Sequence, residues 1–335
     1  MTPALLLAGT IMVALTAYVL MGGADFGGGV WDLFASGPRR RAQRDLIAQA
    51  IGPIWEANHV WLILVVVLLF VCFPAVFARV SIALHIPLSL MLVGIVLRGS
   101  AFTFRTHDSQ RDDVQQRWGL IFSMSSVITP ILLGIVAGTI AAGRIPAAPV
   151  GEFAAVYIAP WLALFPLAIG AMALTLFAFL AAVYLTLEAE DRELQDAFRA
   201  RALAAAVLVF GAALAAIMLA RTDAPRVWHG LTQTTWAVAY QLAIALAAVA
   251  TIGALWTRRF RIARAAAALQ ATLILWGWAL IQFPWMLPGQ LTIEDAAAPA
   301  ITLRLTLGTL VVGFVVLVPS LIYLFRVFKS HEREA

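Results

Sequence analysis

The sequence predicts an all-α integral membrane protein with about nine transmembrane helices. Of its 335 residues, 62% are hydrophobic and only 12% are charged, and the mean hydropathy is +0.92. Soluble domains carry about 25% charged residues, so the composition excludes an ordinary soluble protein. Apolar runs longer than about 18 residues recur along the whole chain, which indicates membrane-spanning helices rather than a β-barrel.

The apolar runs form one membrane domain over residues 1–335. We expect spans at roughly 4–24, 51–77, 80–104, 118–142, 155–187, 202–220, 233–256, 265–285 and 300–325. The fifth run is long enough either to tilt or to begin as an interfacial helix. The first run lacks the basic start of a secretory signal, so we expect it to remain as a span.

The distribution of basic residues predicts the orientation. If the N-terminus is outside, the cytoplasmic segments are 37–50, 105–117, 188–201, 257–264 and 326–335, and they hold 17 of the 23 Arg and Lys residues. The external segments hold four. This asymmetry follows the positive-inside rule, so the C-terminus is expected in the cytoplasm. The net charge of +5 therefore indicates membrane orientation and not nucleic-acid binding.

Residues suited to metal or haem binding are few. Cys72 is the only cysteine, which excludes an internal disulfide and a C-x-x-C-H haem attachment. Glu56 and His59 form an E-x-x-H motif, but a di-iron bundle needs a second such motif and further carboxylates on facing helices. Two histidines at matched depth could hold a haem, but His59 is expected deeper than His85. We therefore expect no metal ligand and no haem ligand in this chain.

Charged residues within the predicted spans, or directly after one, point to a function. At a rise of 1.5 Å per residue, Asp25 lies about 18 Å from the cytoplasmic end of the first helix if that helix continues to Gly37. Glu56 lies about 16 Å along the second helix, counted from Asp45. Arg98 lies about 10 Å deep on the third span. Such a polar group marks a proton or ion pathway; a buried ion pair that fixes the register of the helices is the alternative. Gly23 and Gly27 beside Asp25 form a G-x-x-x-G pair that favours close helix packing.

These residues belong to motifs that resemble the second subunit of cytochrome bd-type quinol oxidases. The motifs are GADFGGGVWDLF, IGPIWEANHVWL, RGSAFTFR, RWGLIFSMSSVITPILLGIVAG and FPWMLPGQLTIEDAAA, in family order from end to end. The family's acidic residues fall on Asp25 and Glu56. The second of these positions is Asp in the family member compared, and that member has an additional Asp where this chain has Gly22.

The resemblance implies a subunit of an electrogenic terminal oxidase of the aerobic respiratory chain, which couples quinol oxidation to reduction of oxygen to water. The implied complex is a heterodimer in the bacterial inner membrane, to which small accessory subunits can attach. Subunit I is expected to carry two b-type haems, one d-type haem and the quinol-oxidising loop. This chain is expected to bind no haem, although it can hold a structural quinone.

The resemblance also implies that this chain supplies part of the proton route toward the oxygen site. Asp25 and Glu56 are the expected relay carboxylates, with Asn58, His59 and Arg98 as supporting polar groups. A proton-coupled transporter is the alternative, since intramembrane carboxylates and a glycine-rich segment suit it. The sequence shows no paired interrupted helices in two matching halves. In a purely structural scaffold, by contrast, the carboxylates would only form ion pairs.

Overall fold

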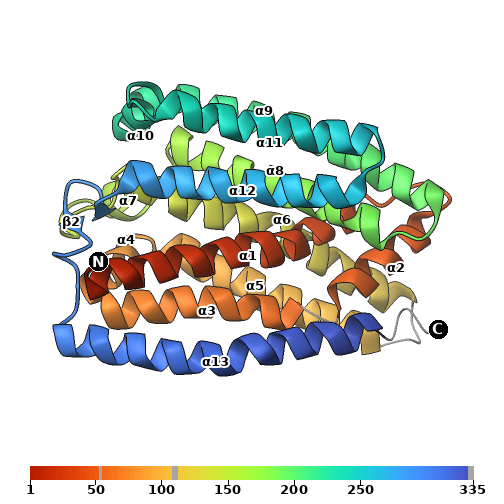
Figure 1. Ribbon diagram of the computed structural model, residues 1–335, viewed down its shortest axis with the longest axis horizontal. Helices are drawn as coiled ribbons and strands as arrows, with labels where there is room; N and C mark the ends of the chain where they lie inside the picture. The colour runs from red at the N-terminus through yellow and green to blue at the C-terminus, as the bar shows by residue number, and fades with distance from the viewer. Residues whose placement is uncertain (53–54, 108–111, 331–335) are drawn as a thin grey trace.

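The computed structural model describes residues 1–52, 55–107 and 112–330. Long helices run side by side through the whole molecule (Figure 1). Within the described ranges, nine helices are long and apolar enough to cross a membrane, which confirms the predicted number. They are α1 (Pro3–Leu33), α3 (Trp55–Cys72), α5 (His85–His107), α6 (Asp112–Ala141), α8 (Leu164–Glu188), α9 (Arg192–Asp223), α11 (Ala237–Trp256), α12 (Phe260–Gln282) and α13 (Ala300–Ser330).

Shorter elements connect the spans and divide two of the predicted runs, and α1 ends at Leu33 rather than at the predicted residue 24. The predicted run 51–77 is divided: α2 (Arg40–Ile51) precedes α3, and Pro74 starts α4 (Pro74–Ala83). Proline lacks a backbone N–H and is tolerated at the first turn of a helix, so it marks a new helix. The predicted run 155–187 is divided into α7 (Phe153–Tyr157) and α8, so it begins as a separate short helix. The other short elements are α10 (Pro225–Thr232), β1 (Trp285–Leu287) and β2 (Leu291–Thr292), which pair antiparallel.

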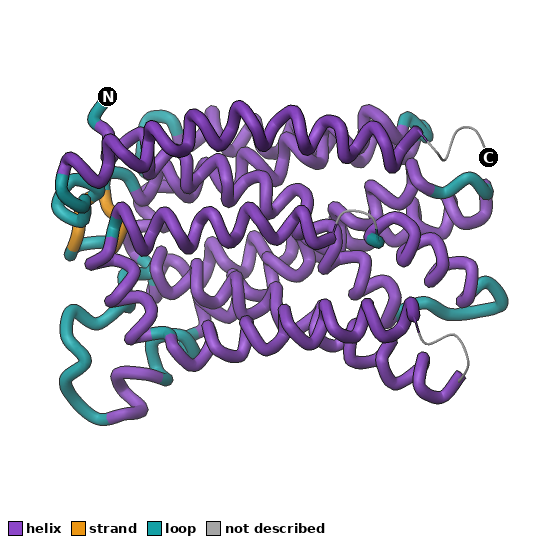
Figure 2. The backbone as a smooth tube through the Cα atoms, turned by 90° about the horizontal axis from the view of Figure 1, so that it is seen from below, coloured by secondary structure: helices purple, strands orange, loops and turns teal. Residues whose placement is uncertain are grey.

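The basic segments gather at one end of the bundle. In Figure 1, α2, the connection between α8 and α9, and the connection between α11 and α12 lie at the end where α13 finishes. The opposite end holds the N-terminus, α4, α7 and α10, and Figure 2 shows the two strands at that end as well. This arrangement agrees with the predicted loop alternation. The direction of the bundle across the membrane remains a prediction.

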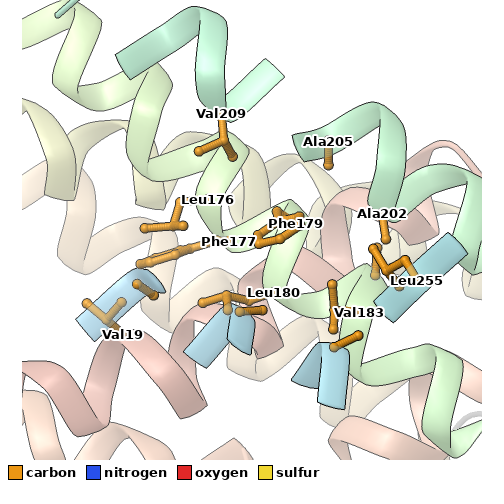
Figure 3. Packing of buried hydrophobic residues seen from close by; sticks show 14 of the residues in the cluster. Val19, Leu176, Phe177, Phe179, Leu180, Val183, Ala202, Ala205, Val209 and Leu255 are labelled. Atoms are coloured by element: carbon orange, nitrogen blue, oxygen red, sulfur yellow. The ribbon is translucent and has the colours of Figure 1, made fainter. Parts of the chain in front are cut away.

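The centre of the molecule is built where α1, α6 and α8 pack together. In Figure 3, the buried α8 side chains from Leu176 to Val183 form a row, with Val19 of α1 at one end and Leu255 of α11 beside Ala202 of α9 at the other. Gly27 of α1 lies so close to α8 that a Cβ atom there would overlap the Phe177 carbonyl and approach Ala181 Cβ to 2.7 Å. The prediction of close packing at the Gly23–Gly27 pair is therefore confirmed. It also explains why α1 continues as a helix to Leu33 in spite of its glycines.

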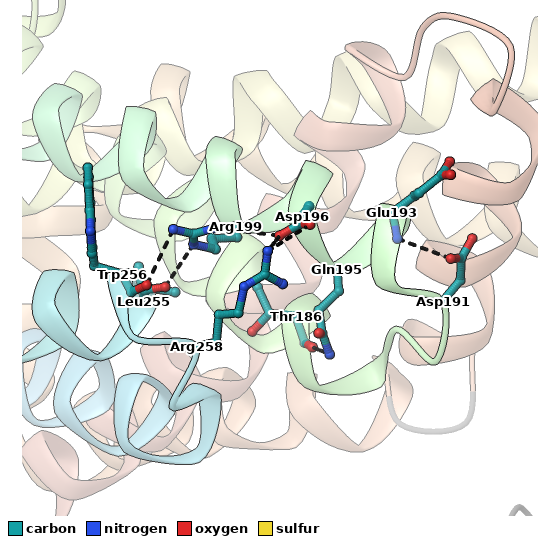
Figure 4. A network of polar contacts seen from close by, with 9 residues as sticks. All are labelled: Thr186, Asp191, Glu193, Gln195, Asp196, Arg199, Leu255, Trp256 and Arg258. Carbon is teal, nitrogen blue, oxygen red and sulfur yellow. Dashed lines mark hydrogen bonds and ion pairs between the residues drawn. The ribbon is translucent and has the colours of Figure 1, made fainter.

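Polar contacts close the basic end of the bundle. Arg258 has a positive φ of 58° in the tight connection between α11 and α12. Its Nη2 atom lies 2.8 and 2.9 Å from the two carboxylate oxygens of Asp196 on α9 (Figure 4). Arg199 Nε donates to the Leu255 carbonyl at 2.8 Å. These bonds join α9 to the end of α11 and fix the position of the basic loop.

Candidate functional site

Asp25 lies inside the bundle, where it contacts α3. Its side chain is 4% exposed, and Asn58 Nδ2 donates to Asp25 Oδ2 at 2.5 Å. Asn58 itself is fully buried. A buried carboxylate needs such a donor, because removing it from water without compensation is costly. The structure therefore places Asn58, one of the predicted supporting groups, directly on the first predicted relay carboxylate.

Arg98 is the second buried charge of this region. It is 1% exposed, and its Nε donates to Ser126 Oγ on α6 at 3.2 Å. Its guanidinium carbon lies 4.6 Å from the centre of the Phe26 ring and 5.2 Å from that of Phe122. Aromatic faces attract a cation strongly when water is excluded. The charge is thus stabilised by two rings and a hydroxyl on neighbouring helices.

His59 completes the polar cluster from α3. Its ring centre lies 6.1 Å from that of Tyr18, 5.9 Å from that of Phe26 and 6.2 Å from that of Trp55. His85 belongs to a different region, at the start of α5, where its Nδ1 lies 3.0 Å from the Ile82 carbonyl. His59 lies in the early turns of α3. α3 and α5 start at opposite ends of the bundle. The two histidines, each near the start of its helix, are therefore not at matched depth.

Glu56 lies outside the cluster, on the surface of the chain. It is exposed, in the first turn of α3. Asn58 is two residues further on, which turns its side chain by about 200° from that of Glu56. Glu56 shares its face with Val60, Ile63 and Val67, which are 43%, 60% and 47% exposed. The carboxylate therefore heads an apolar stripe that faces away from the bundle.

The level of Glu56 along the bundle agrees with the prediction, although the reason given for it was wrong. The estimate assumed one continuous helix from Asp45 to Glu56, whereas the described residues form two helices, α2 and α3. The contact between Asn58 and Asp25 now fixes the level instead. Since Glu56 precedes Asn58 by two residues, it lies about 3 Å along the axis from that contact. The two carboxylates share a level but face different sides of α3.

Four polar residues on α1 and α6 were not predicted: Asp32, Ser123, Ser126 and Thr129. Asp32 is fully buried, and Ser123 Oγ donates to its Oδ2 atom at 3.0 Å. Arg44 Nε on α2 lies 3.7 Å from the same oxygen. Ser126 accepts from Arg98 as described, and Thr129 follows it on α6. The sequence held a signal for them: Asp32 follows Asp25 by two helical turns, and the three hydroxyls recur every third residue.

Several buried polar atoms of the cluster have no hydrogen-bond partner among the described residues. They are Asn58 Oδ1, His59 Nδ1, Arg98 Nη2 and Thr129 Oγ1. Buried polar groups in proteins nearly always bond to protein or to ordered water. A polar site of this kind is where water molecules bind inside proteins. In the described part of the chain, no three His, Cys, Asp or Glu residues are grouped as a metal site would require.

The fold and the site define a multi-pass membrane protein with a carboxylate and a guanidinium buried inside its helices. The model of the family "Cytochrome bd terminal oxidase subunit II" matches residues 3–328. The chain therefore belongs to the cytochrome bd terminal oxidase subunit II family. It is a subunit of a quinol:oxygen oxidoreductase, and nothing in the comparisons favours a transporter.

Individual relatives support this assignment. The putative cytochrome bd menaquinol oxidase subunit II of Bacillus subtilis (strain 168) is 22% identical over 348 residues, covering 99% of this chain and 97% of that protein. Cytochrome bd-I ubiquinol oxidase subunit 2 of Escherichia coli (strain K12) is 27% identical over 135 residues, covering 39% of this chain and 34% of that protein. In fold, the chain is similar to the bd oxidase from Geobacillus thermodenitrificans, with a TM-score of 0.78 and 22% identity; the match covers 98% of this chain and 99% of that one.

Proposed function

We propose that this chain carries protons from the cytoplasm through the Asp25 cluster to Glu56, and from Glu56 into subunit I, where oxygen is reduced. The observation that carries the proposal is the opposite orientation of Asn58 and Glu56 on α3. Asn58 bonds to the buried Asp25, whereas Glu56, two residues away, is exposed. A single turn of α3 therefore carries both the buried Asn58 and the exposed Glu56, at nearly the same level along the bundle.

The proposed surface for subunit I is the exposed apolar face of α3 together with α13. Along α3 this face contains Glu56, Val60, Ile63 and Val67. Next to α3, α13 buries only Leu303 among the described residues of its apolar run. A carboxylate facing lipid is expensive, so Glu56 favours a protein neighbour that supplies a hydrogen-bonding group or water. Subunit I packed on this face would meet that requirement.

The chain's own residues supply donors and acceptors for this route. Asp25 and Glu56 can each hold a proton on a carboxyl oxygen, while Asn58 orients Asp25 through its amide. Buried atoms such as Arg98 Nη2 and Asn58 Oδ1 favour bound water between the carboxylates. Proton transfer needs hydrogen-bond distances at each step, directly or through one water. His59 and Tyr18 enclose the cluster from the side of α1 and α3.

For the complex as a whole, we propose the arrangement that the family resemblance implies. Two b-type haems, one d-type haem and the quinol-oxidising loop lie in subunit I, in the bacterial inner membrane. Small accessory subunits and a structural quinone complete the complex. The relatives are named as menaquinol and as ubiquinol oxidase subunits, so the substrate is assigned here only to the class of quinols.

Quinol oxidase turnover per haem d tests the proposal. In an assembled complex, Glu56→Gln and Asp25→Asn should lower oxygen consumption about tenfold or more, because an amide cannot exchange the proton that a carboxylic acid carries. Glu56→Asp keeps the acid one methylene shorter and should retain part of the activity. Asp45→Asn changes an exposed carboxylate on α2 in the same way and serves as the control. Wild-type turnover in both Glu56→Gln and Asp25→Asn would contradict the route and leave a scaffold.

A further inference from the structure

The polar residues between α1 and α6 extend from the Asp25 cluster toward the basic end of the bundle. Asp32 lies seven residues after Asp25 on α1, which is about 10 Å along the axis and nearly the same face. It is fully buried, yet it contacts Arg44 of α2, which is itself partly exposed. A buried carboxylate at this position is costly, and it lies between the arginine-rich end of the bundle and the Asp25 cluster.

The hydroxyls of α6 follow the same path in the opposite direction. Ser123 lies against Asp32, at a distance of 3.0 Å between Ser123 Oγ and Asp32 Oδ2. Ser126 lies against Gly29, where a Cβ atom would overlap its hydroxyl. Each step of three residues back along α1 thus corresponds to a step of three forward along α6. The same register, continued by one step, would bring Thr129 to the level of Phe26, the residue after Asp25.

The surroundings keep this line of hydroxyls buried and polar. Gly29 on α1 and Gly94 on α5 have no Cβ atom, and a Cβ at either position would overlap Ser126 Oγ or Thr129 Oγ1. Ser126 accepts from Arg98 Nε and donates to the Phe122 carbonyl. Thr129 Oγ1 is buried without a partner among the described residues, as is Arg98 Nη2. Both atoms are suited to bind water in the interval between Ser126 and Asp25.

We propose that Asp32 is the cytoplasmic carboxylate of the proton route and that Ser123, Ser126 and Thr129 connect it to Asp25. This proposal rests on the proposed function of Asp25 and Glu56. Asp32 takes up a proton from water at the basic end of the bundle and releases it toward Ser123. Each hydroxyl then accepts one proton and gives up its own to the next water or hydroxyl, so no group gains net charge. The proton arrives on an Asp25 carboxyl oxygen.

Proton uptake during the reaction of the fully reduced complex with oxygen tests this proposal, measured with a pH-indicator dye alongside haem oxidation. Asp32→Asn should slow uptake about tenfold, while Asp32→Glu should restore much of the rate. Ser123→Ala and Ser126→Ala should slow uptake less, because water can replace a hydroxyl. Ser125→Ala removes a buried hydroxyl from another face of α6 and should match wild type.

The structural alternative is that Asp32 only holds α2 to α1 through Arg44. In that case Arg44→Gln and Asp32→Asn would lower the thermal stability of the complex alike, and proton uptake per assembled complex would stay at the wild-type rate.

Fast uptake in Asp32→Asn combined with slow uptake in Asp25→Asn would overturn this proposal alone. Fast uptake in Asp25→Asn and Glu56→Gln as well would overturn the proposed function itself. If Asp32→Asn does not assemble, wild-type uptake in the Ser123→Ala, Ser126→Ala double variant would refute the hydroxyl path.

Discussion

Gly27 offers the sharpest test of the packing that holds Asp25 in place. Alanine at this position puts a Cβ atom onto the Phe177 carbonyl of α8 and within 2.7 Å of Ala181 Cβ. A backbone carbonyl cannot turn aside as a flexible side chain can, so α1 and α8 must separate. Gly9 on the same helix is the matched control, because nothing lies within 4 Å of a Cβ atom built there.

The two glycines should respond with opposite signs. Replacing a glycine inside a helix with alanine gains about 1 kcal/mol from backbone entropy. Overpacking a tight contact costs about 3 kcal/mol at the upper end of the usual range. The net change is therefore a gain of about 1 kcal/mol at Gly9 and a loss of about 2 kcal/mol at Gly27. The two variants should differ by about 3 kcal/mol.

Thermal unfolding of the purified complex, followed by tryptophan fluorescence and by haem absorbance, measures this difference. Gly27→Ala should unfold below the wild type and Gly9→Ala at or above it. Displacement of α1 should also disturb Asp25, so turnover per haem should fall in Gly27→Ala and stay unchanged in Gly9→Ala. Equal unfolding temperatures for the two variants would refute the close contact between α1 and α8.

Two further predictions concern haem and orientation. His59→Ala and His85→Ala should leave the haem content of an assembled complex unchanged, because the two histidines lie toward opposite ends of the bundle; loss of one haem from an assembled variant, seen by pyridine haemochrome spectra, would contradict this. Reporter fusions after Gly37 and Arg261 should show a cytoplasmic location and a fusion after Pro149 an external one, since loop charges set the orientation. One reversed reporter would break the alternation of nine spans.

The number of spans could be predicted because it follows from composition alone. Each apolar run must satisfy its backbone hydrogen bonds internally in lipid, so runs of the right length become helices. The breaks were harder to predict. Pro74 interrupts a run that stays apolar on both sides, and the segment from α7 to α8 is apolar throughout. Hydropathy does not separate a spanning helix from a short helix at its end.

The candidate site was predicted in part, for a similar reason. Charged residues in spans stand out by their cost, so Asp25 and Arg98 were found. Asp32 lay beyond residue 24, the predicted end of the first span, and was not singled out, whereas α1 continues to Leu33. Serine and threonine hydroxyls carry no such signal, because they commonly bond to their own helix, as Ser126 does to Phe122. The role proposed for them depends on the placement of α6 against α1, which only the structure supplies.

The orientation of Glu56 also required the structure. From spacing alone, Glu56 and Asp25 were expected to share a level, and they do. Whether Glu56 points toward Asp25 of α1 or away from it depends on the rotation of α3 about its own axis. This rotation is set by the packing of α3 against α1. The contact between Asn58 and Asp25 fixes that rotation and turns Glu56 outward. In the proposed route, this exposed carboxylate leads from the buried cluster to subunit I.

The most direct test is the membrane potential generated in a single turnover, recorded when the fully reduced complex in liposomes reacts with oxygen. If protons reach the oxygen site from the cytoplasm through this chain, Glu56→Gln should leave electron transfer among the haems at its normal rate. The same variant should slow the later, proton-linked rise of the potential about tenfold or more, and Glu56→Asp should recover part of that rate. An unchanged proton-linked phase in assembled, haem-replete Glu56→Gln would contradict a route through Glu56.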